Sequence, residues 1–337
     1  MKSKIFKALI IAILSANVVY AEGLREMRMS SVPTINIPMS KVDENYEELY
    51  GSKWKFIKDK NGVYIYSYDD TVKKFIGLDP ETVDALNKSY LKDKNGIYKF
   101  EEGENEQDLK ITPINAKIDF KNLKELDWKY FGDDKNIYYF DEDSFKKVDK
   151  ADINSFERID STGFFKDKNN VYYEGEKVEG IDMNSIEVIN GMCIKDKNSV
   201  FYQGKKLEKI SSNNFNYFDG GMSYDIILVD KNGAYKLMEN ENQKDKIKII
   251  PLDSKNIDLK TLERIESPMD SSNYFKDKNG VYFLNGEKFV KINGADIDSF
   301  EVTMSGKYGK DRNNVYFEGK KMEGENPKKF EEEMEIK

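Results

Sequence analysis

Carboxylates are the main candidates for chemistry in this 337-residue chain, because histidine is absent and cysteine occurs once. Without histidine, the Ser-His and Cys-His pairs that activate nucleophiles are excluded, and so are most zinc sites. Two carboxylates can still work as acid and base, as they do in glycosidases. With 62 Asp and Glu residues some pairing is inevitable, and no pair stands out. We therefore expect no catalytic residue, no cofactor and no enzymatic activity, with a carboxylate-based envelope hydrolase as an alternative.

The single cysteine, Cys193, lies between Met192 and Ile194. This apolar setting favours a buried strand position over a reactive thiol, because free cysteines are among the most buried residues. One cysteine cannot form an internal disulfide, so packing alone must stabilise the fold.

A calcium site is suggested by Asp59-Lys-Asn-Gly, which begins like an acidic cation-binding loop. The following positions do not fit, because Val63 stands where an EF-hand loop needs an oxygen ligand. An Asn/Gly hairpin turn explains the same residues. We expect a turn and no metal site, and leave open a weak cation bound between adjacent turns.

Aromatic residues follow this turn in most copies and could stack against a sugar or a peptide. We favour the other interpretation, in which the rings seal one repeat against the next. The candidate ligand platform consists of Tyr64, Tyr172, Phe201, Tyr282 and Tyr316.

The elements that position these residues are repeats marked by Asp-Lys-Asn or its variant Asp-Arg-Asn. The copies are spaced by 29 to 47 residues and begin at Asp59, Asp93, Asp134, Asp167, Asp196, Asp230, Asp277 and Asp311. The third copy is one residue short after the turn, so its loop is expected to differ. The long insertions after Asp93 and Asp230 resemble one another, which groups the eight repeats into two blocks of four.

Each repeat has the pattern of a β-hairpin, with two apolar runs flanking a short Asn/Gly cluster. Asn169 and Asn170, or Gly at the second position in other copies, suit left-handed backbone positions. A second turn at Gly175-Glu-Lys and its equivalents predicts three strands per repeat. Upstream, the pattern Asp-x-x-(Ser/Thr), as at Asp152, predicts an N-cap on one short helical turn.

The predicted fold is mainly β, with eight tandem antiparallel hairpin or meander repeats in an open superhelical array. A closed propeller-like ring is the alternative. The expected segments are a signal peptide (1–21), a lead-in (22–50), repeat block one (51–190), repeat block two (191–322) and a charged tail (323–337).

At the motif residues the chain resembles the DKNYY repeat family of bacterial exported proteins. The matching strings begin at Asp134, Asp167 and Asp277, the second reading Asp-Lys-Asn-Asn-Val-Tyr-Tyr. The resemblance covers roughly residues 50–322. It implies a secreted or envelope-associated repeat protein without established activity, and it supplies no catalytic residues.

The N-terminal residues predict export. Lys2, Lys4 and Lys7 form a positively charged segment, and the apolar run Ala8–Leu14 follows it. Small residues near Ala21 suit a signal peptidase. The run is too short to span a membrane, and no second long apolar stretch follows, so no membrane span is expected in the mature chain. The expected location is the periplasm, the cell surface or the medium.

The charge distribution argues against nucleic acid as a partner. The net charge is -8, with acids and bases interspersed and no basic patch. We therefore expect a non-enzymatic scaffold that binds a protein or glycan partner at the cell envelope. A glycan-binding module using the hairpin aromatics is the alternative.

Overall fold

The computed structural model describes residues 32–334 except 50–54, 67–70, 88, 102–109, 115–117, 119, 121, 128, 142–143, 221–224, 240–246 and 269–271. The predicted signal peptide, residues 1–21, lies outside the described residues, as do residues 22–31 of the predicted lead-in. In the described part, no helix is both long and apolar enough to cross a membrane.

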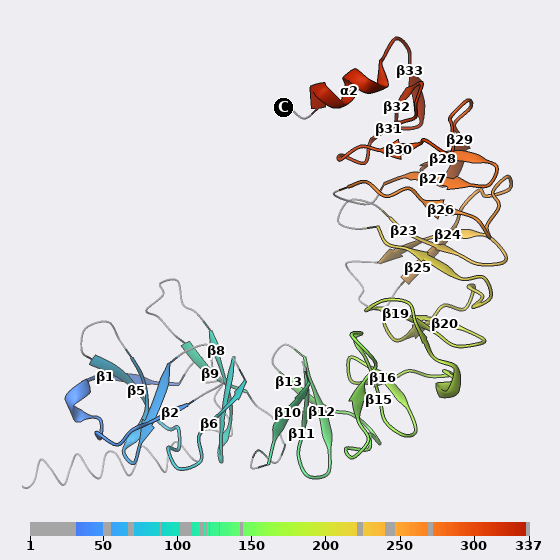
Figure 1. The fold of residues 1–337 in the computed structure, drawn as a ribbon. Coiled ribbons are helices and arrows are strands. Elements are labelled where there is room, and N and C mark those ends of the chain that lie inside the picture. Colours follow the sequence, from blue (N-terminus) through green and yellow to red (C-terminus); the bar gives the residue numbers. More distant parts are fainter. Residues whose placement is uncertain are drawn as a thin grey trace, which may run out of the picture. The chain divides into compact units, whose positions relative to one another are not determined.

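The described chain forms eight small antiparallel sheets that follow one another along the sequence (Figure 1). The first sheet has the strand order β1-β5-β4-β3-β2, and each later sheet has four strands in consecutive order. The first contains β1 (Thr34–Pro38), β2 (Glu47–Leu49), β3 (Phe56–Asp59), β4 (Gly62–Tyr66) and β5 (Thr71–Phe75). The second contains β6 (Asp84–Asn87), β7 (Tyr90–Asp93), β8 (Gly96–Glu101) and β9 (Lys110–Ile114). The third contains β10 (Lys124–Asp127), β11 (Tyr130–Gly132), β12 (Ile137–Asp141) and β13 (Ser144–Lys147). The fourth contains β14 (Glu157–Arg158), β15 (Phe164–Lys166), β16 (Val171–Tyr173) and β17 (Glu176–Lys177).

The remaining four sheets repeat the same order. The fifth contains β18 (Glu187–Val188), β19 (Cys193–Lys195), β20 (Val200–Tyr202) and β21 (Lys205–Lys206). The sixth contains β22 (Asn216–Phe218), β23 (Ile226–Val229), β24 (Ala234–Glu239) and β25 (Ile247–Pro251). The seventh contains β26 (Glu263–Arg264), β27 (Tyr274–Asp277), β28 (Gly280–Asn285) and β29 (Lys288–Lys291). The eighth contains β30 (Glu301–Val302), β31 (Tyr308–Lys310), β32 (Val315–Phe317) and β33 (Lys320–Met322).

Helical structure is short in the described residues. It consists of the 3-10 turns η1 (Met39–Lys41) and η2 (Met183–Ser185) and the helix α2 (Pro327–Met334). Asp182 is the N-cap of η2, and its side chain accepts a hydrogen bond from the N–H of Asn184, as the Asp-x-x-Ser pattern predicts. Helix α2 lies in the segment predicted as a charged tail, and its Phe330 packs against Tyr308 with ring centroids 5.1 Å apart.

The predicted fold class is confirmed, since the chain is a series of antiparallel meanders, one for each repeat. Three strands were predicted for each repeat, and the structure has four, because a short strand such as β14 precedes each hairpin. Four strands fit into so few residues because the shortest are only two residues long. In the predicted lead-in, β1 and β2 are the edge strands of the first sheet.

The chain divides into two compact units at the fourth sheet, to which both units contribute. The described residues up to 157 belong to the first unit, and those from 178 onward belong to the second. Within the second unit the sheets from β18–β21 to β30–β33 lie one after another in sequence order, as predicted for an open array (Figure 1).

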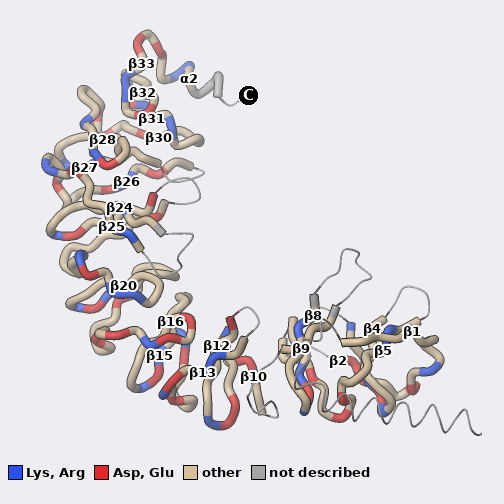
Figure 2. Tube along the Cα trace, turned by 180° about the vertical axis from the view of Figure 1, so that it is seen from behind, with Lys and Arg blue, Asp and Glu red and all other residues tan. Residues whose placement is uncertain are grey.

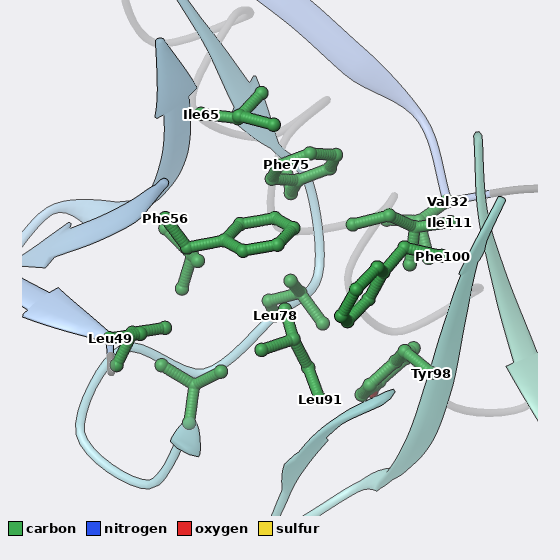
Figure 3. Packing of buried hydrophobic residues seen from close by; sticks show 12 residues of the cluster. Val32, Leu49, Phe56, Ile65, Phe75, Leu78, Leu91, Tyr98, Phe100 and Ile111 are labelled. Carbon is green, nitrogen blue, oxygen red and sulfur yellow. The ribbon is translucent and has the colours of Figure 1, made fainter. Parts of the chain in front are cut away.

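The core lies between successive sheets. In the first unit, one cluster joins the first two sheets, and Figure 3 shows the ring of Phe56 among those of Phe75 and Phe100, with Leu78 and Leu91 beside them. The ring centroid of Phe56 is 5.8 Å from that of Phe75 and 5.3 Å from that of Phe100. A single small hairpin is marginally stable in water, so burial against the next sheet stabilises each repeat.

The first turn of each hairpin differs from the prediction in its backbone. Asn169, Asn170 and the glycines at the equivalent position, such as Gly280, do not have positive φ angles, so the predicted left-handed conformation is wrong. Asp at the first position and Gly at the fourth are instead typical of a type I turn. In this turn the aspartate side chain, rather than a left-handed residue, holds the backbone.

The second turn has the left-handed residues. Glu174 and Gly175 have φ angles of 48° and 76°, and both central residues of a type I′ hairpin turn require positive φ. A Cβ atom added to Gly175 would lie 2.5 Å from the Cβ of Tyr139 in the preceding repeat. The same close approach occurs between Gly204 and Tyr173 and between Gly319 and Phe283, so glycine lets these three second turns rest on an aromatic ring of the repeat before.

Two glycine variants separate backbone strain from packing. Gly286 and Gly319 both have positive φ, but a Cβ at Gly286 meets nothing within 4 Å, whereas one at Gly319 would lie 2.5 Å from the Cβ of Phe283. We expect Gly286→Ala to lose about 1 kcal/mol of unfolding free energy from strain alone. Gly319→Ala should lose a further ~1–3 kcal/mol from overpacking. Urea unfolding measures both, and equal losses would show that the ring contact is unimportant.

Candidate functional site: the aspartate-centred turns and the cleft at Lys231

The motif aspartate of each repeat joins three parts of the chain, as Asp277 illustrates. Its Oδ1 accepts hydrogen bonds from the N–H groups of Asn279 (2.7 Å) and Gly280 (3.0 Å), which close the hairpin turn. The same oxygen accepts a hydrogen bond from the Tyr282 hydroxyl (3.0 Å). Its Oδ2 accepts the N–H of Asp258 (2.6 Å), 19 residues upstream. One buried carboxylate thus holds the hairpin turn, the following strand and the upstream turn that begins at Asp258 together.

This arrangement recurs along the described chain. In all eight repeats the motif aspartate accepts hydrogen bonds from the N–H groups two and three residues further on. In seven of them its second oxygen accepts an upstream N–H, from Asp43, Asp79, Asp152, Asp182, Ser211, Asp258 or Asp296. These aspartates therefore serve as structural acceptors within their own repeats.

The third copy is centred on Asp133, not on Asp134 as its Asp-Lys-Asn tripeptide suggested. Asp133 accepts hydrogen bonds from the N–H groups of Lys135 (2.7 Å) and Asn136 (2.6 Å) and from the hydroxyl of Tyr138 (2.8 Å). Asp134 takes the place of the motif lysine. With this register the third repeat is no longer one residue short.

The aromatic residues of the candidate platform are all buried. Tyr64, Tyr172, Phe201, Tyr282 and Tyr316 expose between 0% and 2% of their surface. The hydroxyls of Tyr64, Tyr282 and Tyr316 donate to the motif aspartates of their own repeats. Burial, together with the hydrogen bond to Asp277, raises the pKa of Tyr282 to about 12. The rings fill the interior of the repeats, as the core interpretation predicts, and present no open face to a ligand.

An exposed ion pair borders each typical first turn. The ammonium of Lys278 lies 2.5 Å from Oδ2 of Asp258, and this contact lowers the pKa of Asp258 and raises that of Lys278. The corresponding pairs are Lys60–Asp43, Lys94–Asp79, Lys168–Asp152, Lys197–Asp182 and Arg312–Asp296. Figure 2 shows acidic and basic residues interspersed along the chain. Exposed pairs add little stability, but they neutralise the lysine beside each turn.

The sixth repeat lacks this neutralisation. Ser211 replaces the upstream aspartate and still donates its N–H to Oδ2 of Asp230 (2.6 Å), so the hydrogen bond that shapes the repeat is kept. The carboxylate that would pair with Lys231 is absent. Lys231 is exposed, and among the described residues its ammonium has no carboxylate partner.

A cleft of about 370 Å³ opens at this position, within the second unit. Its lining residues come from the upstream segments and first turns of the sixth and seventh repeats: Asn214, Asp230, Lys231, Ile257, Asp258, Leu259, Lys260 and Lys278. The cleft therefore combines three lysines with two apolar residues, Ile257 and Leu259.

Cys193 is in β19 and is fully buried, which confirms the predicted strand position. Burial raises the pKa of its thiol to about 12, so the thiolate is scarce at neutral pH. In the part of the chain that the structure describes, no group of three or more Cys, Asp and Glu side chains is placed to hold a metal ion.

Sequence reasoning identified the motif aspartates and their turns but not their upstream partners. The signal was the nearly constant spacing between the Asp-x-x-(Ser/Thr) element and the motif, which the backbone hydrogen bond now explains. The sequence reasoning also missed Lys231. An alignment of the eight repeats places Ser211 at the position where six other repeats have the aspartate that pairs with the basic residue of the turn.

The fold and these turns define a class of protein, a tandem β-repeat protein in which each repeat is built around an aspartate that is buried in seven of the eight. The chain belongs to the DKNYY family, which matches residues 164–320 and 274–336, together just over half of the sequence. No curated protein and no solved structure matches the chain.

Replacing one motif aspartate tests its structural role. We expect Asp277→Ala to lose about 3 kcal/mol of unfolding free energy, because it leaves three backbone N–H groups and the Tyr282 hydroxyl without their acceptor. Lys278→Met removes only the exposed ion pair and should lose much less. Urea unfolding of both variants gives the comparison, and a similar loss in the two would contradict the assigned role.

Stability should fall in acid. Burial is the largest single influence on Asp59 and Asp311 and opposes their ionisation, but the several hydrogen bonds that each accepts, including those from the N–H groups of Asp43 and Asp296, together outweigh it and lower the pKa of both carboxyls. A carboxyl with a lowered folded-state pKa stabilises the fold above its unfolded pKa of about 3.9, and this stabilisation is lost as the pH falls through the folded value. The chain has no histidine to titrate near neutrality.

We therefore expect the urea midpoint to change little from about pH 7 to about pH 5 and to fall steeply below about pH 4. Asp311→Asn should flatten the acid limb of this profile. A steep loss above about pH 5 would show that other groups govern the stability.

Proposed function

We propose that the protein is an exported, non-enzymatic repeat scaffold that binds a partner at the bacterial cell envelope. The observation that supports this role is the use of the motif residues: the aspartates accept backbone N–H groups in their own repeats, and in the first, second, third, seventh and eighth repeats a tyrosine hydroxyl also donates to them. Repetition therefore maintains a rigid framework, and binding falls to the exposed turns that vary between repeats.

The partner most compatible with this surface is polar. The first turns present exposed lysines beside half-buried aspartates, whereas the aromatic rings that would stack against a sugar are buried. A glycan partner would then bind through hydrogen bonds and charges, not through a ladder of rings. Export rests on Lys2, Lys4 and Lys7 and on the apolar run Ala8–Leu14 that follows them.

Export and binding can be tested in one bacterial expression experiment. The full chain should be recovered outside the cytoplasm with its N-terminus near Glu22, as intact mass would show, and a chain lacking residues 2–21 should stay in the cytoplasm. The exported protein should sediment with envelope fragments in a saturable manner. Cytoplasmic retention of the full chain, or the absence of saturable sedimentation, would overturn the proposal.

A control tests the proposal that the protein is not an enzyme. Envelope glycans incubated with the exported protein should keep their mass distribution over the time in which binding is complete. Release of glycan fragments that grows with protein concentration would assign a hydrolase instead.

A further inference from the structure

The sixth repeat departs from the others at one position that affects charge but not shape. Ser211 keeps the backbone hydrogen bond to Asp230 yet supplies no carboxylate to Lys231. In the other repeats with Lys or Arg after the motif aspartate, that basic residue is paired, as Lys197 is with Asp182 at 2.6 Å. The substitution therefore exposes one unneutralised ammonium on an intact turn.

A second lysine without a carboxylate partner in the described chain lines the same cleft. Lys260 is exposed, and its backbone N–H donates to Asp258 (3.2 Å) at the start of the helical turn. The side chains of Lys231 and Lys260 thus line one cleft from two successive repeats of the second unit.

The two aspartates of the lining do not offset these lysines. Asp230 is fully buried, and its oxygens accept the N–H groups of Asn232, Gly233 and Ser211. Asp258 is paired with Lys278. Lys231 and Lys260 therefore remain available to an anion.

We propose that this cleft binds a phosphate ester of a small sugar or polyol. Two ammonium groups match the two charges of a phosphate monoester, and lysine binds phosphate as a point charge. A volume of about 370 Å³ suits a ligand of this size. Ile257 and Leu259 provide apolar walls for its carbon atoms.

This inference deepens the proposed binding function by naming a ligand class, and it can fail separately. If the exported chain binds the phosphate ester but does not sediment with envelopes, only the envelope role is wrong. If it sediments but does not bind the ester, only the ligand class is wrong.

The test is calorimetric titration of the exported chain with glycerol 3-phosphate, with glycerol and sodium sulfate at matched ionic strength as controls. We expect saturable binding of the ester and none of glycerol. Lys231→Ala and Lys260→Ala should each weaken binding about tenfold, since each removes one charged contact. Lys320→Ala, which removes an exposed lysine from the eighth sheet, is the matched control and should bind as the parent does.

Ser211→Asp is the sharpest variant, because it restores the carboxylate that other repeats carry. It should neutralise Lys231, weaken ester binding about tenfold and leave the thermal unfolding midpoint unchanged. Should this variant unfold, the two lysine variants decide the question. The proposal is overturned if the parent shows no saturable binding, if sulfate binds equally well, or if Lys320→Ala weakens binding as much as Lys231→Ala.

Discussion

The carboxylate of the motif aspartate lies where three stretches of each repeat meet, and the remainder of the repeat depends on it. A tight turn and a short helical turn both leave backbone N–H groups without partners, and a buried N–H without an acceptor is costly. In the seventh repeat, one side chain accepts hydrogen bonds from two turn amides, one upstream amide and a tyrosine hydroxyl. Only an ionised or strongly accepting group of this small size can replace so many water contacts.

Packing between repeats follows from this local constraint. Once the turn is fixed, the strand after it places residues on both faces of a sheet covered on both sides, so Val281 and Tyr282 are both buried. In the fourth, fifth and eighth repeats the second turn then rests on an aromatic ring of the preceding repeat, which requires glycine at Gly175, Gly204 and Gly319. Each repeat is stabilised by its neighbours, as in other tandem-repeat proteins.

The sequence allowed prediction of features that depend on local chemistry. The hairpin at Asp59, the capping role of Asp182 and the burial of Cys193 each follow from a few adjacent residues. Features that depend on register or distance could not be predicted. Asp133 and Asp134 are both acidic, and only the positions of Asn136 and Tyr138 in the fold decide between them.

The same limit applies to the candidate site. The link from Asp230 to Ser211 uses a backbone N–H, which any residue except proline provides, so side-chain patterns do not reveal it. The first and second turns both contain glycine or asparagine, and composition assigned the left-handed backbone to the wrong one. The exposed ammonium of Lys231 follows from Ser211, whose place beside the motif is fixed by its hydrogen bond to Asp230.

Amide hydrogen exchange of the native protein tests the central claim most directly. The N–H groups of Asp152, Asp182 and Asp296 lie outside the strands, yet each donates to a buried motif carboxylate. If these carboxylates hold the repeats together, the three amides should exchange as slowly as those in the centres of neighbouring strands. Exchange at the rate of exposed loop amides would contradict the account.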